Sequence, residues 1–254
     1  MQHRYFGDVG DFGKYGLLRV LSGLSGGPMF KLGVVWYLFP DEDHNADGKH
    51  ISYLRNPRKY RDSDEPLFDL LHSVLLDEAG ELINGARQIK HAETSGMLSE
   101  GTQFYSEPLA FPVSMRSQDR KKLRRDWYAA ALAATVGIDL VFVDPDNGVE
   151  CKIKRTAKKG PKYVYWDDIE AFVKRGQSGV VYHHLNFGCP HPEQVEDKLR
   201  QMNERFGNGY ESFAVRFKRD ACRAYFIIAF PLHKDLLRLR LTTMLSGPWN
   251  RHFE

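Results

Sequence analysis

Carboxyl and amide side chains follow an apolar run in the sequence IDLVFVDPDNGVE, at residues 138–150. The proline, asparagine and glycine after this run force a turn at once, so the acidic groups project from the end of a buried strand. Ligands in open α/β sheets bind where strands end in this way. We therefore expect a catalytic centre made by Asp144, Pro145, Asp146 and Asn147, although an ordinary strand-to-turn junction uses the same residue types.

A second stretch, GDVGDFGKYGLLRVL at residues 7–21, has a glycine at every third position from residue 7 to residue 16. Charged groups that could grip a ligand lie between these glycines: Asp8, Asp11 and Lys14. The stretch is not a phosphate-binding P-loop, because Lys14 is followed by Tyr15 rather than by serine or threonine. The pattern predicts a flexible, glycine-rich segment folded over the sheet edge, followed by a short helix over residues 17–24. A helix-capping aspartate with permissive glycines is the alternative.

Positive charge is concentrated in two segments, although the formal net charge is only +3. One is RKKLRR at residues 120–125, on a predicted helix that begins at Ser117, and the other is CKIKRTAKKGPK at residues 151–162, in a predicted loop. Such clusters are typical of proteins that bind a polyanion such as nucleic acid, and solvated surfaces carry them as well. Because the loop directly follows the aspartate-rich turn, we expect these of its side chains to bind substrate: Lys152, Lys154, Arg155 and Lys158.

A third cluster, VVYHHLNFGCPHP at residues 180–192, also follows an apolar run. Adjacent histidines on a strand point to opposite faces, so one of His183 and His184 faces the site and the other packs beneath a helix. We assign His183 and Asn186 to the substrate-binding side. A zinc site from Cys189 and a nearby histidine would lack a second ligand pair.

The elements that must position these groups alternate between strands and helices, which favours a mainly parallel, doubly wound sheet because parallel neighbours need crossover helices. Strands are predicted over residues 31–39, 103–111, 138–146, 178–186, 210–218 and 222–230, and helices over 57–89, 117–136, 167–176, 191–207 and 232–245. The last two strands form an antiparallel hairpin near the C-terminus. No linker divides the chain, so we expect a single domain over residues 1–254 with a helical or loop insertion at about 41–116.

The opening HRYFGDVGDFGKYGLL resembles that of the bacterial rRNA adenine methyltransferases of the RlmJ type, which belong to the Rossmann-like methyltransferases that use S-adenosylmethionine. The matching positions are Gly7, Asp8, Gly10, Asp11, Lys14 and Tyr15. The turn after residue 143 is similar to the family's Asp-Pro-Pro-Tyr motif. The resemblance implies transfer of a methyl group from S-adenosylmethionine to an amine of a DNA or RNA base, with Asp144 and the carbonyl of Pro145 receiving the amine.

Cofactor contacts are assigned on this resemblance to Gly10, Asp11, Lys14, Tyr37 and Asp41. Two departures from the family pattern stand out. The first core strand ends in WYLFPDED rather than in a glycine-rich turn, so carboxylates such as Asp41 and Asp43 would hold the ligand's amino group or ribose hydroxyls. Asp-Pro-Asp-Asn also lacks the aromatic ring that would stack on a flipped base. Aromatic residues elsewhere that could replace this ring, though core positions are their more common use, are Trp36, Tyr37, Tyr163, Tyr165 and Trp166.

Two functions of other classes stay open. A Mg²⁺-dependent nuclease or phosphodiesterase would use carboxylates that converge on the metal, namely Asp8, Asp11, Asp144 and Asp146. The Glu150-x-Lys152 sequence is also of nuclease type, but it lies too close to Asp146 for the two to occupy neighbouring strands. A non-catalytic protein with a methyltransferase-like fold would bind a nucleotide or a partner without turnover.

The composition points to a cytoplasmic protein that does not bind a membrane. No apolar run reaches the length of about 18 residues that a membrane helix needs, and the first residues lack the order of a signal peptide. The three cysteines, Cys151, Cys189 and Cys222, form no CxxC pair, which fits reduced thiols.

Overall fold

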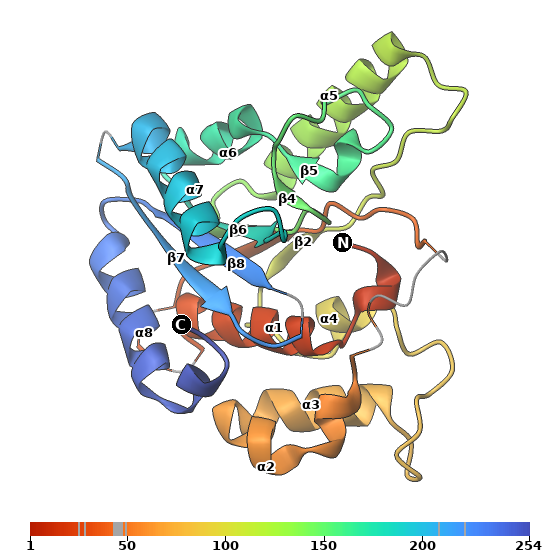
Figure 1. Cartoon of the computed structure of the whole chain (residues 1–254), viewed down its shortest axis with the longest axis vertical. Coiled ribbons are helices and arrows are strands. Elements are labelled where there is room, and N and C mark those ends of the chain that lie inside the picture. The colour runs from red at the N-terminus through yellow and green to blue at the C-terminus, as the bar shows by residue number, and fades with distance from the viewer. Residues whose placement is uncertain (25, 28, 43–47, 49, 208, 221) are drawn as a thin grey trace.

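The computed structural model describes residues 1–24, 26–27, 29–42, 48, 50–207, 209–220 and 222–254, and it is a mixed α/β structure built around a six-stranded, mostly parallel sheet (Figure 1). The strands of this sheet, in spatial order, are β2 (Gln103–Tyr105), β1 (Leu32–Val35), β3 (Leu140–Val143), β6 (Ser178–His184), β8 (Arg223–Ala229) and β7 (Glu211–Phe217). The α-helices are α1 (Val9–Ser22), α2 (Pro57–Tyr60), α3 (Glu65–Leu75), α4 (Lys90–Thr94), α5 (Ser117–Ala134), α6 (Trp166–Val173), α7 (His191–Phe206) and α8 (Lys234–Ser246). Two short strands, β4 (Gly148–Val149) and β5 (Tyr163–Val164), form a separate parallel pair.

Helices cover both faces of the sheet, because its strands are apolar on both sides. Alternate residues of each strand enter different hydrophobic clusters: on β3, Phe142 packs in the cluster beneath α1, α3 and α8, and Val141 packs in the cluster beneath α5, α6 and α7. Figure 1 shows these two groups of helices on opposite sides of the sheet. The doubly wound, mostly parallel arrangement predicted from the alternating elements is therefore confirmed.

The direction of the last strand departs from the rest of the sheet. Among the strands of the described residues, β8 alone runs antiparallel, and it lies between β6 and β7. The predicted hairpin of β7 and β8 is confirmed, with a register that pairs Glu211 with Ala229 and Phe217 with Arg223. The carboxyl ends of β3 and β6 and the amino end of β8 consequently meet at one edge of the sheet.

The prediction of a flexible segment over residues 7–16 is wrong, because these residues open a 14-residue helix, α1. Asp8 is the N-cap, with its side chain accepting a hydrogen bond from the backbone N–H of Asp11. Gly23 ends the helix in a left-handed conformation, with φ of 97°. The structure thus agrees with the capping alternative.

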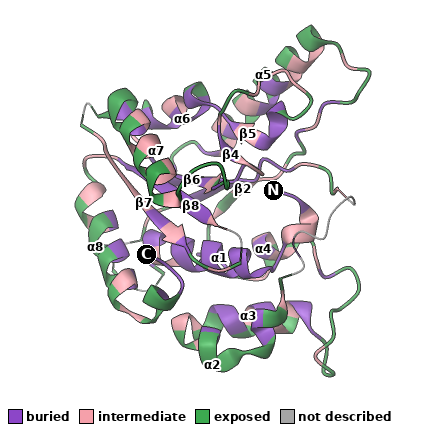
Figure 2. Cartoon of the chain, in the orientation of Figure 1, coloured by how far each residue is buried: buried purple, intermediate pink, exposed green. Residues whose placement is uncertain are grey.

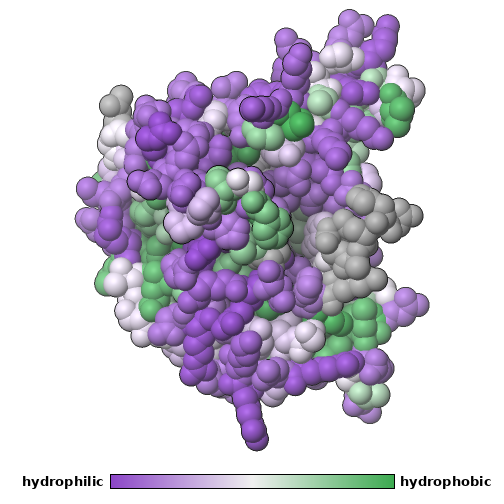
Figure 3. Space-filling model, in the orientation of Figure 1, coloured by the Kyte–Doolittle hydropathy of each residue, from purple (hydrophilic) through white to green (hydrophobic). Residues whose placement is uncertain are grey.

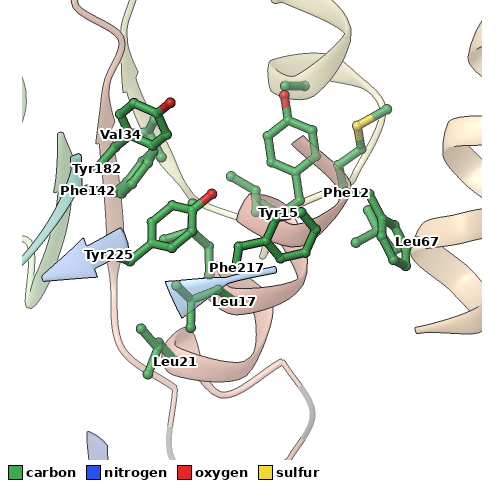
Figure 4. Packing of buried hydrophobic residues seen from close by; sticks show 14 of the residues in the cluster. Phe12, Tyr15, Leu17, Leu21, Val34, Leu67, Phe142, Tyr182, Phe217 and Tyr225 are labelled. Atoms are coloured by element: carbon green, nitrogen blue, oxygen red, sulfur yellow. The ribbon is translucent and has the colours of Figure 1, made fainter. Parts of the chain in front are cut away.

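The glycines of α1 are needed where neighbouring groups leave no room for a side chain. A Cβ on Gly10 would lie 1.9 Å from the guanidinium of Arg223, and one on Gly13 would lie 2.4 Å from the ring of Phe217. Other faces of α1 are buried as well (Figure 2). Phe12, Tyr15 and Leu17 enter the main hydrophobic cluster, whose close packing is shown in Figure 4.

The connection between β1 and β2 holds α2, α3 and α4 and lies mostly within the range expected for an insertion. The helix predicted over residues 57–89 is confirmed only in part, since α3 ends at Leu75 and a turn follows in which Gly80 and Gly85 have positive φ. Strand β2 is shorter than predicted and belongs to the main sheet through its pairing with β1.

Candidate functional site

A cavity of about 350 Å³ opens at the sheet edge where β3 and β6 end, beside the amino end of α1. Its volume lies within the range of small-molecule sites. The residues that line it come from six segments of the chain: Met1, Tyr5, Asp8, Gly10, Asp11, Lys14, Gly48, His50, Asp144, Pro145, Asp146, Asn147, Tyr182, His184, Leu185, Phe187, Cys222 and Arg223. The turn after β3 and the first turns of α1, which the sequence singled out separately, therefore share one cavity.

Lys14 ties these two segments together. Its Nζ lies 2.7 Å from Asp11 Oδ1 and 2.7 Å from Asp144 Oδ2, and all three side chains are buried. Burial disfavours the charged form of Lys14, but the carboxylates of Asp11 and Asp144 outweigh it and raise the pKa of the ammonium. The lysine is therefore charged throughout the physiological range and fixes Asp144 from one side.

Asp11 and Asp8 have their own partners within the protein. Asp11 Oδ2 accepts hydrogen bonds from the backbone N–H of Gly7 at 3.1 Å and from the hydroxyl of Tyr15 at 3.0 Å. Asp8 Oδ2 lies 3.2 Å from Nη2 of Arg223. These contacts hold the amino end of α1 against β8. A role of Asp11 and Lys14 in cofactor binding stays a prediction, since the hydrogen bonds found here are to protein groups.

Asp144 lines the cavity and has one carboxylate oxygen without a hydrogen bond to a described residue. Its Oδ2 accepts from Lys14, whereas Oδ1 of Asp144 and the carbonyl oxygen of Pro145 accept no hydrogen bond from any described residue. Burial raises the pKa of the Asp144 carboxyl, although Lys14 favours its charged form. Two adjacent residues that line the cavity, Asp144 and Pro145, therefore each have an oxygen that accepts no hydrogen bond from a described residue.

Asp146 belongs to a second ionic group on the other side of the turn. Its Oδ2 lies 2.9 Å from Nζ of Lys162 and accepts a hydrogen bond from Gln2 at 3.0 Å. Lys162 also bonds Glu42 at 2.5 Å. These contacts fasten the turn to the start of the chain and to the segment after β1, and Asp146 also lines the cavity. Asn147 lines the cavity, and its backbone N–H donates to the carbonyl of Lys162 at 2.9 Å.

The strand geometry of β6 separates the two histidines as alternation requires. His184 lines the cavity, whereas His183 packs on the other face against the ring of Phe226, and its Nδ1 accepts from the backbone N–H of Val149 at 3.1 Å. Burial, with contributions from Lys198 and His184, lowers the pKa of His183 to about 3. The structure thus places His183, the histidine assigned to the site, outside the cavity lining.

The structure also places three other predicted residues away from the cavity lining. Tyr37 is buried on the opposite face of the sheet, with its ring 4.8 Å from that of Trp127. Asp41 accepts a hydrogen bond from the backbone N–H of Arg4 at 3.1 Å, and Asn186 closes a turn by accepting from the N–H of Gly188 at 2.7 Å. Asp43 lies outside the described residues.

The two positive segments lie side by side. Nη1 of Arg120 on α5 donates to the carbonyl of Thr156 in the loop at 3.3 Å. Three of the four predicted loop cations, Lys152, Lys154 and Lys158, are exposed. Arg155 instead covers the ring of Tyr165 at 4.6 Å and pairs with Asp167. None of the four is among the residues that line the cavity, so they form an outer surface rather than its wall. Figure 3 shows that the projecting part of the molecule around α5 is largely hydrophilic.

Sequence reasoning missed Arg223, Tyr182, His184 and Phe187 as lining residues. A signal existed for Arg223, because an arginine within the apolar strand sequence CRAYFIIAF needs a buried partner. That partner is Asp8, and Nη1 of Arg223 has no hydrogen-bond partner in the described part of the chain. For Tyr182 and His184, whether the side chain lines the cavity depends on which face of β6 meets α1, and Phe187 follows the end of that strand.

The described residues contain no group of three or more His, Cys, Asp or Glu side chains that could hold a metal ion. The carboxylates expected to converge on Mg²⁺ are separated by cations: Lys14 lies between Asp11 and Asp144, and Arg223 pairs with Asp8. No helix in the described ranges is long and apolar enough to cross a membrane.

Comparison with known proteins gives no match: no family model fits the chain, and neither a curated protein nor a solved structure resembles it at a significant level. The function must therefore be argued from the cavity.

Proposed function

We propose that this protein transfers a methyl group from S-adenosylmethionine to an exocyclic amine of a nucleic-acid base. The observation that carries the proposal is the pair of open acceptors at the carboxyl end of β3, Asp144 Oδ1 and the carbonyl oxygen of Pro145. An aromatic amine has two N–H donors and therefore needs two acceptors close together.

The protein's part in the reaction is mainly alignment. Lys14 holds Oδ2 of Asp144, which leaves Oδ1 and the Pro145 carbonyl as the acceptors that we assign to the amine. The two oxygens accept the amine hydrogens and keep the amine nitrogen directed into the cavity. The raised pKa of Asp144 suits its Oδ1 to receive the proton that the amine loses.

The lining residues fit the proposed cofactor in charge. S-adenosylmethionine, when bound, supplies a methyl group on a positively charged sulfur. Buried acidic side chains line the cavity, and the guanidinium of Arg223, which lines it too, is the group we assign to the carboxylate of the cofactor. The sheet also supports the proposal, since a mostly parallel sheet with one antiparallel strand near the end of the chain is the arrangement that the resemblance implies.

A nucleic-acid acceptor is favoured by the outer surface that α5 and the loop at residues 151–162 share. Exposed lysines on this surface make no ion pair with a described residue: Lys121, Lys152, Lys154, Lys158 and Lys159. Phosphates are the anions that such a surface attracts, and they need not touch the cavity for a base to enter it.

The test is a calorimetric titration with S-adenosylmethionine, followed by transfer of a labelled methyl group to mixed RNA and DNA. Asp144→Asn keeps the size of the side chain, so we expect it to bind the cofactor about as well as the native protein and to lose at least about 100-fold in transfer. The matched control is Asp139→Asn, which changes an aspartate just before the amino end of the same strand, where it accepts from the N–H of Lys31.

Absence of cofactor binding by folded native protein would contradict the proposal. Cofactor binding without transfer to any nucleic acid would favour the non-catalytic alternative.

A further inference from the structure

Phe187 is the most exposed of the large hydrophobic residues described, at 96%, and it lines the cavity. Leaving such a side chain in water forgoes the stabilisation that its burial would give. Single exposed apolar residues are common on protein surfaces. What distinguishes Phe187 is that it lines the same cavity as Asp144 and Pro145 and that hydrogen bonds hold the turn that carries it.

Side-chain hydrogen bonds hold the turn at residues 186–189 in one conformation. Gln194, in the second turn of α7, accepts from the N–H of Asn186 at 3.1 Å and donates to the carbonyls of Asn186 and Cys189, both at 2.7 Å. The Asn186 side chain closes the turn onto the N–H of Gly188 at 2.7 Å. The ring of Phe187 is thus presented by a turn whose backbone is already fixed, which lowers the entropy cost of using it in binding.

Other aromatic rings near the site are less available for stacking. Tyr5 also lines the cavity and is partly exposed, but the guanidinium of Arg4 lies 5.0 Å from the centre of its ring. Trp36 and Tyr37 are fully buried, and Tyr165 and Trp166 are exposed by only 3% and 7%. Among the lining residues, Tyr182 packs against Tyr225 and is 9% exposed. Phe187 is thus a ring that both lines the cavity and is exposed enough to stack on a ligand.

We propose that Phe187 stacks on the nucleobase whose amine Asp144 and Pro145 receive, and so takes the place of the ring that the Asp-Pro-Asp-Asn turn lacks. This inference rests on the proposed function and narrows its substrate to an unpaired or extruded base with an exocyclic amine, namely adenine, cytosine or guanine rather than uracil or thymine. Stacking is indifferent to the identity of the base, whereas the two acceptors require the amine. Affinity and base choice therefore reside in different residues.

The test separates these two contributions with cytidine and uridine monophosphates, which stack alike but differ in the amine. Both are titrated calorimetrically into the protein, with and without saturating S-adenosylhomocysteine. We expect Phe187→Ala to weaken binding of both nucleotides by about tenfold or more, and Phe187→Trp to restore it. Asp144→Asn is expected instead to remove the preference for cytidine monophosphate. The control is Leu232→Ala, which truncates a side chain that is 85% exposed and follows β8 at the opposite edge of the sheet.

The possible results distinguish failure of the stacking inference from failure of the proposed function. Unchanged nucleotide binding in Phe187→Ala, with cofactor binding intact, would refute the stacking role and leave the proposed function standing. An equal loss of S-adenosylmethionine binding in the same variant would assign the ring to the cofactor. If the native protein binds no cofactor but its nucleotide binding still depends on Phe187, the methyl-transfer proposal fails and base stacking survives.

Discussion

At the scale of single residues, each of two buried lysines near the site forms ion pairs with two carboxylates. Lys14 serves both Asp11 and Asp144, and Lys162 serves both Asp146 and Glu42. A buried carboxylate that loses its cation keeps the cost of desolvation without the compensating attraction. Each shared lysine therefore contributes to stability, and Lys14 also fixes the position of the Asp144 carboxylate.

We expect Lys14→Met to lower the free energy of unfolding by about 3 kcal/mol or more, because two buried carboxylates then lack a cation. Thermal denaturation measures this loss, which corresponds to a fall in Tm of about 10 °C in a chain of this size. Lys174→Met is the control, since it breaks an exposed pair with Glu170 on α6. Such pairs contribute at most about 0.5 kcal/mol. Equal stability of the two variants would refute the bridging role of Lys14.

At the scale of elements, α1 shows why spacing alone misled the sequence prediction. Glycine at every third position is typical of flexible segments, and helix interiors disfavour glycine. Residues three apart in a helix also lie on one face, however, so the same spacing suits a helix that other groups approach closely. The choice between a flexible segment and a closely packed helix depended on Arg223 and Phe217, which lie about 200 residues further along the chain.

We expect Gly13→Ala to destabilise the protein by about 1–2 kcal/mol. Alanine favours the helix by about 0.5–1 kcal/mol, but its Cβ would overlap the fully buried ring of Phe217, and overpacking costs about 1–3 kcal/mol. Urea denaturation checks the result. The control is Gly179→Ala in β6, where a Cβ would meet no atom within 4 Å. A gain in stability on Gly13→Ala would show that α1 does not need the close approach.

Other elements were predictable because their signals are local. The central strands β1, β3, β6 and β8 follow from apolar runs, and the hairpin follows from the short gap between two such runs. The placement of β8 between β6 and β7 was not predictable from these patterns, since it depends on long-range pairing.

The cavity was predicted in part. The residues that follow β3 were placed by strand-end reasoning, whereas the choice between His183 and His184 required knowing which face of β6 meets α1.

At the scale of the whole molecule, charge is distributed unevenly, although the formal net charge of the chain is only +3. The exposed lysines of α5 and of the following loop form one surface, although the two segments are separated in sequence by β3 and the acidic turn. The fold therefore concentrates exposed positive charge on one surface, outside a cavity whose carboxylates are paired with buried cations. On the function proposed here, this surface would attract the phosphates of the nucleic acid.

We expect binding of a fluorescent single-stranded RNA 20-mer, measured by anisotropy at several salt concentrations, to weaken steeply as salt is added. Replacing Lys154 and Lys158 by alanine should reduce the slope of log K against log salt by about two. The control replaces two other exposed lysines, Lys31 and Lys90, which lie outside this surface. An equal change of slope in both double variants would contradict a localised binding surface.

The position of β8 also has a consequence for biosynthesis. Among the strands of the described residues, β8 comes last in the sequence, so it leaves the ribosome after the other strands of the main sheet. Until residues 223–229 emerge, β6 and β7 cannot pair across that gap, and their apolar edges resemble those through which nascent chains aggregate. Because Arg223 belongs to β8, the ion pair between Arg223 and Asp8 cannot form until this strand has been synthesised. The same strand therefore completes both the sheet and the Asp8–Arg223 contact at the cavity.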